Sequence, residues 1–418
     1  MTTAADENRL ERRLAQADSA AGISFAALPK TGPAPVDAVY VHVPFCSTKC
    51  HYCDFYSLAG HLDEVDAYLD ALKREAALQV HHFGRPRPET IFIGGGTPTL
   101  LNPAELERLM AILHESIDMS RLNEFTVEAN PNTFDAPRAR VLKAAGVNRI
   151  SCGAQSFVKS ELQTLQRDHD PENVPLAFEI ARAAGIENLN VDLIFGIPGQ
   201  TLESWVYSLD RALALAGGGP DHLSCYSLIY ESNTAMTARL NRGEFTPIDE
   251  DLELALFEHV YRRLRDAGYQ RYEVSNYARP GRECRHNLHY WKGGQWLAWG
   301  PSAAAHVAGW RWKNVTNLTH YLAALQEKDP QVPATQMERL STRRRAGELA
   351  VFWLRLAEGL NYAEFHRIAG LDARPVLERV LKNYAELGFV SLTPTAARLE
   401  EKAVVVSNRI LTDVVDAF

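Results

Sequence analysis

Short apolar runs alternate with amphipathic segments from about residue 37 onward. Six runs rich in β-branched and aromatic residues predict strands near residues 37–43, 89–94, 124–129, 148–153, 188–195 and 222–229. Amphipathic segments between them predict helices near residues 62–79, 103–116, 171–185 and 201–216. Nearly continuous apolar strands are typical of a parallel sheet that is covered on both faces. The alternation therefore predicts an α/β fold, with a sheet that is either open or curled into a partial barrel.

The pattern changes after residue 275. Residues 276–315 are rich in Gly, Trp, His and Asn and show little regular period, whereas 342–358 and 372–387 have helical spacing. Apolar runs at Phe389–Leu392 and Val404–Val406 predict short strands. We therefore expect a small helical, winged-helix-like C-terminal domain. The predicted units are a flexible N-terminal extension, a core domain, a connecting segment and the C-terminal helical domain, at residues 1–35, 36–275, 276–330 and 331–418.

Composition and charge argue against several functional classes. The chain has 418 residues, of which 46% are hydrophobic and 23% charged, with a formal net charge of −8. Its interspersed charges and acidic balance argue against nucleic-acid binding, which needs a basic surface. The sequence has neither the long apolar run of a membrane span nor a secretory signal, so we expect a cytoplasmic protein. In that compartment thiols stay reduced, and neighbouring cysteines usually indicate metal binding or catalysis.

Three cysteines lie together in Cys46-Ser-Thr-Lys-Cys50-His-Tyr-Cys53, directly after the first predicted strand. Thiolates are soft ligands that iron–sulfur clusters and zinc prefer. Three of them can hold three irons of a cubane and leave the fourth iron open for chemistry. A structural zinc site normally needs four ligands, and His51 is too close to Cys50 to complete a tetrahedron. The triplet therefore predicts a [4Fe–4S] cluster.

Polar or glycine residues stand at the ends of the predicted strands that follow. They include the run Gly94–Thr99, Glu128 with Asn130, and Gln155, while Asp192 lies within the fifth strand. The carboxyl ends of parallel strands converge on one face, where ligands bind. We therefore expect one shared site beside the cysteines.

The spacing of the triplet and the run Gly94-Gly-Gly-Thr-Pro-Thr99 resemble the radical S-adenosylmethionine (SAM) superfamily. That resemblance implies a [4Fe–4S] cluster on Cys46, Cys50 and Cys53, with SAM bound at the open iron. It further implies that the glycine run receives the methionyl amino group of SAM.

Further motifs resemble the oxygen-independent coproporphyrinogen III oxidase family. They lie at Tyr40–Cys46, Val127–Pro131, Arg149–Phe157, Leu165–His169 and Asn190–Gly199. This resemblance covers residues 38 to 317 and implies a partial (β/α)₆ barrel. The SAM pocket would then be lined by Tyr40, Tyr52, Gly95, Gly96, Thr97, Glu128, Gln155, Arg167 and Asp192.

Two branches of that family compete. The dehydrogenase branch carries a fourth cysteine two residues after the triplet, where this chain has Phe55. The segment His286-Asn-Leu-His-Tyr290-Trp is instead typical of a haem-chaperone branch. That resemblance implies haem as a ligand, held by His286 or by its rival His289. An imidazole is a common axial ligand of haem iron, and aromatic rings can pack on the porphyrin face.

Three features depart from the family pattern. The stretch Leu297–His306 has fewer glycines than usual, Gln166 replaces a glycine, and a glycine is missing near Lys402. The first two affect how closely backbone approaches the pocket, and the third affects the C-terminal wing.

The leading hypothesis is a haem chaperone that delivers haem to acceptors such as respiratory or cytochrome-type apoproteins, with transient contact at a membrane. The alternative is an enzyme of porphyrin biosynthesis that decarboxylates coproporphyrinogen III, and whether the protein is an enzyme stays open. A third hypothesis is a zinc site on a regulatory or nucleic-acid-binding protein with a winged-helix tail, which the acidic charge disfavours. No catalytic residue is assigned, and neither the haem acceptor nor the oligomeric state can be read from the sequence.

Overall fold

The computed structural model describes residues 36–418 together with Phe25 and Leu28. Apart from those two residues, the predicted extension 1–35 lies outside the described residues. The centre of the fold is a twelve-stranded sheet in the order β14-β13-β12-β11-β1-β4-β5-β6-β7-β8-β10-β9. Six parallel strands form its middle: β1 (Ala38–Val43), β4 (Thr90–Gly95), β5 (Glu124–Ala129), β6 (Arg149–Gln155), β7 (Asn188–Phe195) and β8 (His222–Ser227).

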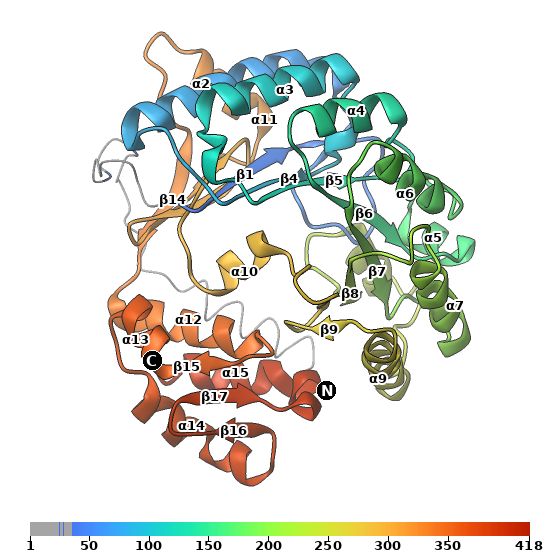
Figure 1. Ribbon diagram of the computed structural model, residues 1–418, viewed down its shortest axis with the longest axis vertical. Helices are drawn as coiled ribbons and strands as arrows, with labels where there is room; N and C mark the ends of the chain where they lie inside the picture. Colours follow the sequence, from blue (N-terminus) through green and yellow to red (C-terminus); the bar gives the residue numbers. More distant parts are fainter. Residues whose placement is uncertain (1–24, 26–27, 29–35) are drawn as a thin grey trace.

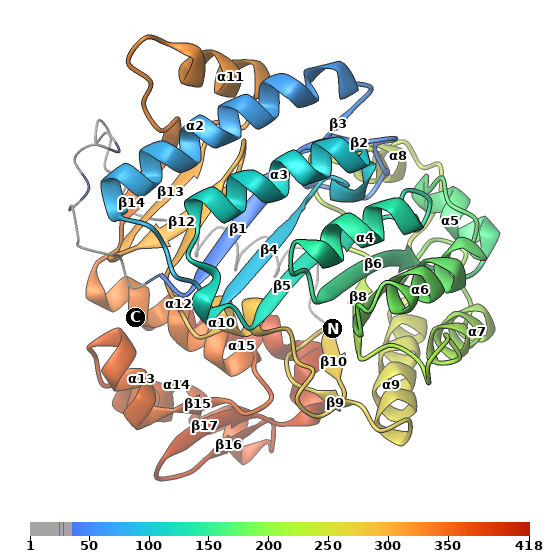
Figure 2. The ribbon, with the colours of Figure 1, turned by 45° about the horizontal axis from the view of Figure 1, so that its top comes forward.

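Helices connect these strands and cover the outer face of the sheet (Figure 2). They include α2 (Val65–Phe83), α3 (Pro103–Ser116), α4 (Ala136–Ala144), α5 (Lys159–Leu165), α6 (Asn173–Ala183), α7 (Leu202–Leu213) and α9 (Glu250–Asp266). Local sequence sets their starts. At α3, Asn102 and Glu105 form a capping box around Pro103 in the first turn. The six strands and the four predicted helices are thus confirmed, with end shifts of a few residues.

The sheet continues beyond the parallel strands at both edges. Strand β11 (Trp296–Trp299) pairs in parallel with β1, and β12 (Ala304–Val307), β13 (Trp310–Asn314) and β14 (Ala334–Arg339) follow in antiparallel order. At the other edge β10 (Asn276–Ala278) and β9 (Gln270–Arg271) pair antiparallel beyond β8. The short helix α10 (Arg285–Trp291) lies on the inner side of the curved sheet, between it and the C-terminal elements (Figure 1). Of its residues, His286, Asn287 and Tyr290 line a cavity on this side.

The C-terminal elements pack around a hydrophobic core of their own, which includes Trp353, Phe365 and Leu411. They are α12 (Thr342–Arg355), α13 (Tyr362–Ala369), α14 (Arg374–Glu386), α15 (Ser407–Val415) and the three-stranded sheet of β15 (Leu360–Asn361), β17 (Ala396–Leu399) and β16 (Val390–Leu392). The strand predicted at Val404–Val406 is wrong, because this segment is the 3₁₀ helix η5 (Glu401–Val406), which leads directly into α15.

The separate cores support our proposal of a core domain and a C-terminal domain, although β14 pairs with the main sheet beyond the proposed boundary at residue 331. The remaining elements are β2 (Phe45–Cys46), β3 (Leu58–Ala59), η2 (Leu62–Glu64), η3 (Pro98–Leu100), η4 (Met119–Arg121), α8 (Ala235–Asn241) and α11 (Leu318–Gln326). In the described part of the chain, no helix combines the length and apolarity that a membrane crossing requires.

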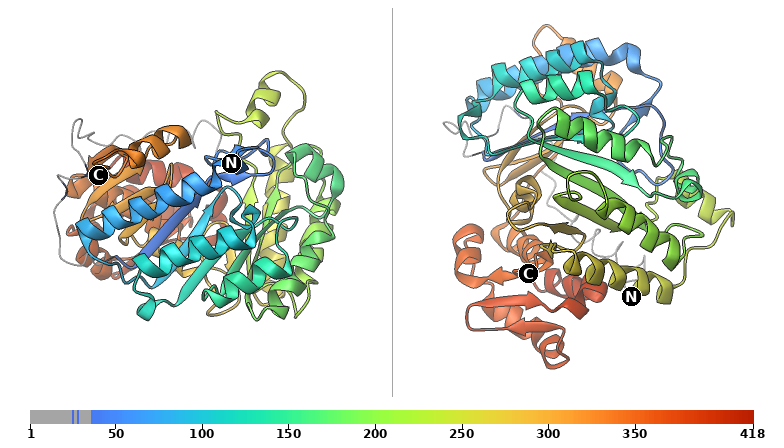
Figure 3. Two further views of the ribbon diagram at one scale, coloured as in Figure 1. Left: turned by 90° about the horizontal axis from the view of Figure 1, so that it is seen from above. Right: turned by 45° about the vertical axis from the view of Figure 1, so that its right-hand side comes forward.

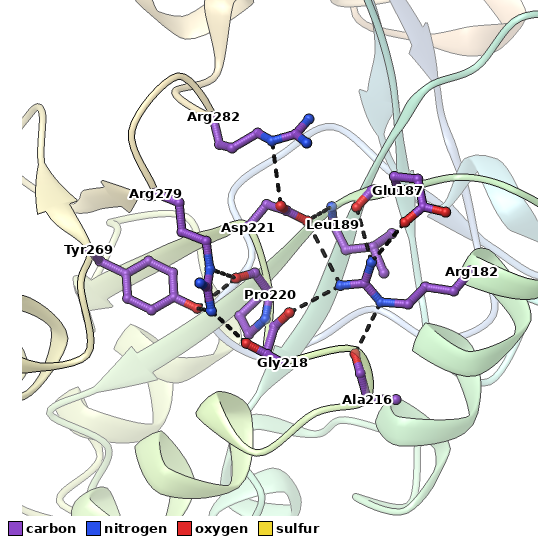
Figure 4. A network of polar contacts seen from close by, with 11 residues as sticks. Arg182, Glu187, Leu189, Ala216, Gly218, Pro220, Asp221, Tyr269, Arg279 and Arg282 are labelled. Carbon is purple, nitrogen blue, oxygen red and sulfur yellow. Dashed lines mark hydrogen bonds and ion pairs between the residues drawn. The ribbon is translucent and has the colours of Figure 1, made fainter.

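A polar network joins the loops at the amino ends of β7 and β8 (Figure 4). Asp221 accepts a hydrogen bond from the backbone N–H of Leu189 at 3.2 Å and forms ion pairs with Arg182 and Arg282. The Arg182 guanidinium also donates to the backbone carbonyl of Ala216 at 3.0 Å. This network fixes the loop before β8 on the side of the sheet away from the cysteines.

Candidate functional site

The cysteine loop leaves the carboxyl end of β1 through the short strand β2. Cys46, Cys50 and Cys53 are free, partly exposed thiols. The backbone N–H of Cys53 donates to the carbonyl of Cys50 at 3.3 Å, which gives the loop a tight turn. Two side chains from other segments reach its sulfur atoms. Thr97, after β4, donates to Cys46 Sγ, and Arg167, after α5, donates to Cys50 Sγ, each at 3.6 Å. The loop is therefore held against the ends of several parallel strands.

Neighbouring segments brace this loop on its outer side. The Ser47 hydroxyl donates to Asp168 at 2.7 Å, and Asn130 donates to the same carboxylate at 3.4 Å. The carbonyl of His51 accepts from the backbone of Met236 at 2.8 Å, where α8 covers the loop. Sequence reasoning did not assign Asp168 to the site, although it lies next to Arg167 in a quoted motif.

The donor set of the loop fits an iron–sulfur cluster. Three thiols within eight residues face one cavity and are not used in disulfides. Burial raises the pKa of Cys53 to about 11 and also raises the pKa of Cys46, so the neutral thiols are favoured until a metal binds. No group of three or more His, Cys, Asp or Glu side chains among the described residues is gathered closely enough to hold a metal ion. Binding a cubane therefore requires the cysteine side chains to reorient.

One cavity of about 1110 Å³ lies on the inner side of the sheet, reached from the cysteine loop. Small-molecule sites usually measure roughly 300–1,000 Å³, so this cavity has room for more than one ligand. Figure 3 shows the curved sheet and the C-terminal elements that enclose this side of the molecule. Apart from the rival haem ligand His289, every site residue predicted from the sequence lines it, namely Tyr40, Cys46, Cys50, Tyr52, Cys53, Gly95, Gly96, Thr97, Glu128, Gln155, Arg167, Asp192 and His286.

Two half-buried carboxyl groups, Glu128 on β5 and Asp192 on β7, line the cavity on either side of β6. Burial raises the pKa of Glu128 to about 7, and the nearby Asp192 raises it further. Burial also raises the pKa of Asp192, although Asn190 and Ser151 donate hydrogen bonds to it at 2.7 and 3.3 Å. Glu128 accepts from the backbone N–H of Gly95 at 3.1 Å. These acids retain acceptor capacity that hydroxyl or amino groups of a ligand can use.

Arg149, the first residue of β6, partly offsets the negative charge of these acids. Its guanidinium is only 2% exposed and lowers the pKa of both Glu128 and Asp192. Its Nε finds no hydrogen-bond partner among the described residues. Sequence reasoning quoted Arg149 in a motif but gave it no role, because a strand arginine alone does not reveal that it points into a barrel.

The glycine run passes so close to neighbouring protein atoms that side chains would not fit. A Cβ on Gly95 would lie 2.5 Å from the ring of His42, and one on Gly96 would lie 2.6 Å from the carbonyl of Phe45. The N–H groups of Gly96 and Thr97 donate to the carbonyls of Val43 and Phe45, each at 2.7 Å. Glycine is therefore required here for β4 to pass close to the start of the cysteine loop.

Arg167 follows a residue in the left-handed conformation. Gln166 ends α5 with φ 58° and replaces the glycine that the family pattern has at this place. The turn lets Arg167 donate to the carbonyl of Gly153 at 2.6 Å and to Cys50. Gln155 also has a positive φ of 64°, beside a shift in the register of β6 and β7. Local strain of this kind is common where side chains are aimed into a site.

Five rings line the cavity in sequence from β1 to β11, and we call them the aromatic wall. Neighbouring ring centroids lie 4.5–6.3 Å apart, in the order Tyr40, Phe92, His286, Tyr290 and Trp296. Hydrogen bonds fix the rings: Trp296 Nε1 donates to the carbonyl of Ala304 at 2.7 Å, and the Tyr290 hydroxyl bonds to His286 Nε2 at 2.8 Å. The wall is a continuous row of ring contacts at the inner face of the sheet, with interplanar angles between 29° and 74°.

The two candidate haem ligands differ in position. His286 is 1% exposed, lines the cavity, and has its other ring nitrogen 2.9 Å from the Thr90 hydroxyl. Burial lowers the pKa of His286 to about 3, so the ring is neutral, as metal ligation requires. His289 instead donates to the carbonyl of Gln295 and does not line the cavity. The structure therefore brings His286, and not His289, together with the other predicted residues.

Comparisons with known proteins agree with this arrangement. Residues 40–212 match the model of the radical SAM superfamily, and residues 340–406 match that of the HemN C-terminal domain. The solved structure of the coproporphyrinogen III oxidase HemN from Escherichia coli, a radical SAM enzyme, superposes with a TM-score of 0.80. It covers 93% of this chain and 91% of its own at 24% identity, so it shows the likeness of fold. Fold and site together define a radical SAM protein.

Relatives with similar sequences identify the family within the radical SAM proteins. The heme chaperone HemW of Bacillus subtilis is 35% identical over 374 residues, which are 89% of this chain and 97% of that protein. The heme chaperone HemW of Mycobacterium tuberculosis H37Rv is 37% identical over 362 residues, covering 85% and 92%. The chain belongs to the HemW family.

Proposed function

We propose that this protein is a haem chaperone that binds a [4Fe–4S] cluster, SAM and haem, and delivers haem to acceptor proteins. The observation that carries the proposal is the single cavity in which three free cysteines, two half-buried acids and the aromatic wall meet. Its volume of about 1110 Å³ exceeds that of most single-ligand pockets, which supports a site for SAM and haem together. The names of the HemW relatives support haem as the cargo.

Cys46, Cys50 and Cys53 hold the iron–sulfur cluster in this proposal. A cluster with one open iron supplies an electron and a coordination site for SAM. The protein orients the cluster through Thr97 and Arg167, whose donors already lie 3.6 Å from two of the sulfur atoms. Hydrogen bonds to cysteine sulfur are among the means by which proteins tune such clusters.

SAM lies across the strand ends in this proposal. Glu128 and Asp192 accept hydrogen bonds from its amino and ribose hydroxyl groups, which would relieve the cost of placing two acids in one cavity. Tyr40, Tyr52, Gln155 and Arg167 complete the pocket, with the Gly95-Gly96-Thr97 segment packed against the cysteine loop.

Haem lies deeper, against the aromatic wall. His286 supplies the axial imidazole in this proposal, which requires Tyr290 to release its hydrogen bond to Nε2. The acceptor proteins are respiratory or cytochrome-type apoproteins that the chaperone meets by transient contact at a membrane. A cytoplasmic location is part of the proposal, since the free thiols suit a reducing compartment.

The test begins with anaerobic reconstitution of the cluster and separate titrations with SAM and haemin. We expect both ligands to bind, and we expect His286→Ala to weaken haemin binding while leaving the cluster absorbance unchanged. A second assay supplies coproporphyrinogen III, SAM and a reductant. Formation of protoporphyrinogen IX would contradict the chaperone proposal in favour of the oxidase alternative. Phe55, which stands where that branch has a fourth cysteine and is 69% exposed, makes this outcome unexpected.

A further inference from the structure

One cation in the cavity has no partner to compensate its charge. Among the described residues, the ammonium of Lys313 makes no hydrogen bond and no ion pair, although the side chain lines the cavity. The other cations of the cavity behave differently. The carboxyl groups of Glu124 and Asp192 lie near Arg149, Arg167 donates to Gly153, and Arg355 donates to Asn408 at 3.3 Å. A half-buried, unpaired ammonium is free to bind an anionic group of a ligand.

Sheet register places Lys313 beside the aromatic wall. Lys313 on β13 lies directly opposite Ala304 on β12, and the carbonyl of Ala304 accepts the indole N–H of Trp296 at 2.7 Å. Ala304 and Trp296 line the same cavity. The ammonium therefore stands near the end of a fixed row of rings.

Charge is distributed unevenly along this wall. Tyr40 at its first end lies near Glu128, whose carboxyl group raises the pKa of the tyrosine after the larger effect of burial. The strand order β13-β12-β11-β1-β4-β5 separates Lys313 from Glu128. On β1 between them, burial and, to a smaller extent, Lys313 lower the pKa of His42 to about 4, so this ring is neutral and does not compete with Lys313 for an anion. A flat acid on the wall is repelled from the Glu128 side and attracted to the Lys313 side.

We propose that Lys313 binds a carboxylate of the flat, conjugated ligand that lies against the aromatic wall, and so sets the orientation of a porphyrin through a propionate. This inference rests on the proposed function, because it places the acidic edge of the haem cargo at β13. The chain contributes the charge through one side chain and the shape through the aromatic wall, in which hydrogen bonds hold His286, Tyr290 and Trp296.

The test compares haemin with haemin dimethyl ester, which has the same ring and iron but no carboxylates. Dissociation constants for both are measured by Soret titration on the full-length wild type, Lys313→Ala, Lys313→Arg and the control Lys382→Ala. Lys382 is an exposed lysine on α14 that does not line the cavity. The wild type and the Lys382 variant should prefer the acid over the ester by about tenfold, a typical effect for a hydrogen-bonded charge.

In Lys313→Ala this preference should fall to about one, through weaker binding of the acid alone, and Lys313→Arg should restore most of it. Higher salt should weaken acid binding in the wild type and not in Lys313→Ala. The subsite is refuted if Lys313→Ala keeps the wild-type preference, or if it weakens acid and ester equally. If the wild type binds neither compound, the proposed haem function is refuted, and the proposed role of Lys313 is refuted as well.

Discussion

The cavity and the polar network of Figure 4 lie at different ends of the same parallel strands, and they treat buried charge in opposite ways. In the network, Asp221 accepts a backbone N–H and pairs with two arginines. In the cavity, burial and then Asp192 raise the pKa of Glu128, and Arg149 and Arg167 each leave a buried Nε without a partner among the described residues. The first arrangement stabilises the fold, whereas the second is suited to a ligand.

Two glutamates sharpen this contrast. Burial raises the pKa of both Glu75 and Glu128 to about 7. Glu75 accepts hydrogen bonds from four protein donors, namely Gln79, Gly300, Asn314 and Tyr321. Glu128 accepts one, from Gly95. A carboxylate saturated by the protein holds the sheet extension in place, while one that is left open can bind something else.

The largest effect is expected in the cysteine loop. Replacing Cys46, Cys50 or Cys53 with alanine should abolish the visible absorbance of the reconstituted cluster, because three thiolates are needed to hold three irons. The matched control is Cys152→Ala, which removes a buried thiol on β6 that does not line the cavity. Iron and sulfide analysis after anaerobic reconstitution checks the result. Full cluster content in all three loop variants would refute the ligand assignment.

A large pH effect is expected at Glu75. The pKa of its carboxyl group is raised from 4.5 to about 7, so the folded state retains a proton that the unfolded chain has lost. Its contribution to stability is complete below pH 4.5 and is lost as the pH rises to about 7, by roughly 3 kcal/mol.

Urea unfolding of the wild type and of Glu75→Gln at pH 4.5, 6 and 7.5 measures this effect, since the amide does not titrate. The free energy of unfolding of the wild type, taken relative to the variant, should fall over this range. A difference that stays constant with pH would show that folding does not raise the pKa of Glu75.

Asp221→Ala should destabilise the fold without affecting ligands. It leaves the Leu189 N–H and two arginines without their acceptor, which should lower the free energy of unfolding by about 2 kcal/mol. Glu187→Ala is the control, because this exposed residue only pairs with Arg182 at the surface and should cost less than about 0.5 kcal/mol. SAM affinity should be unchanged in both. A variant with normal stability and weak SAM binding would reverse the proposed roles of the two regions.

Glu128→Gln should have the opposite effects: unchanged or higher stability, and weaker SAM binding. At pH 8 the wild type carries a carboxylate whose ionisation burial disfavours. The free energy of unfolding of the variant should therefore equal that of the wild type or exceed it by on the order of 1 kcal/mol. Its SAM affinity should fall about tenfold, because an amide accepts fewer hydrogen bonds and brings no charge. Chemical denaturation and SAM titration check the two halves. Loss of stability together with unchanged SAM affinity would make Glu128 a structural residue.

The parallel strands and most of the cavity residues could be predicted from the sequence, because each strand has a local apolar pattern. The apolar runs locate all six strands, and their polar ends locate residues such as Glu128 and Gln155 that line the cavity. The missed features depend on distant pairing. Strand β11 joins β1 across more than 250 residues, and only this pairing brings Trp296 and Lys313 to the cavity.

Other features could not be predicted because tertiary packing overrides local preference. Val404–Val406 has a strand-like composition but forms a 3₁₀ helix that reaches the cavity beside α15. The role of the glycine run also emerges only in three dimensions, since its close neighbours His42 and Phe45 come from another strand and its loop.

The central claim is that the cysteine loop holds a cubane whose open iron meets SAM in this cavity. Electron paramagnetic resonance of the reconstituted, dithionite-reduced wild type tests it most directly, with spectra recorded before and after addition of SAM. The account predicts a reduced [4Fe–4S] signal whose g values shift when SAM binds. A protein that takes up no iron and sulfide, or a cluster whose spectrum is unchanged by saturating SAM, would contradict it.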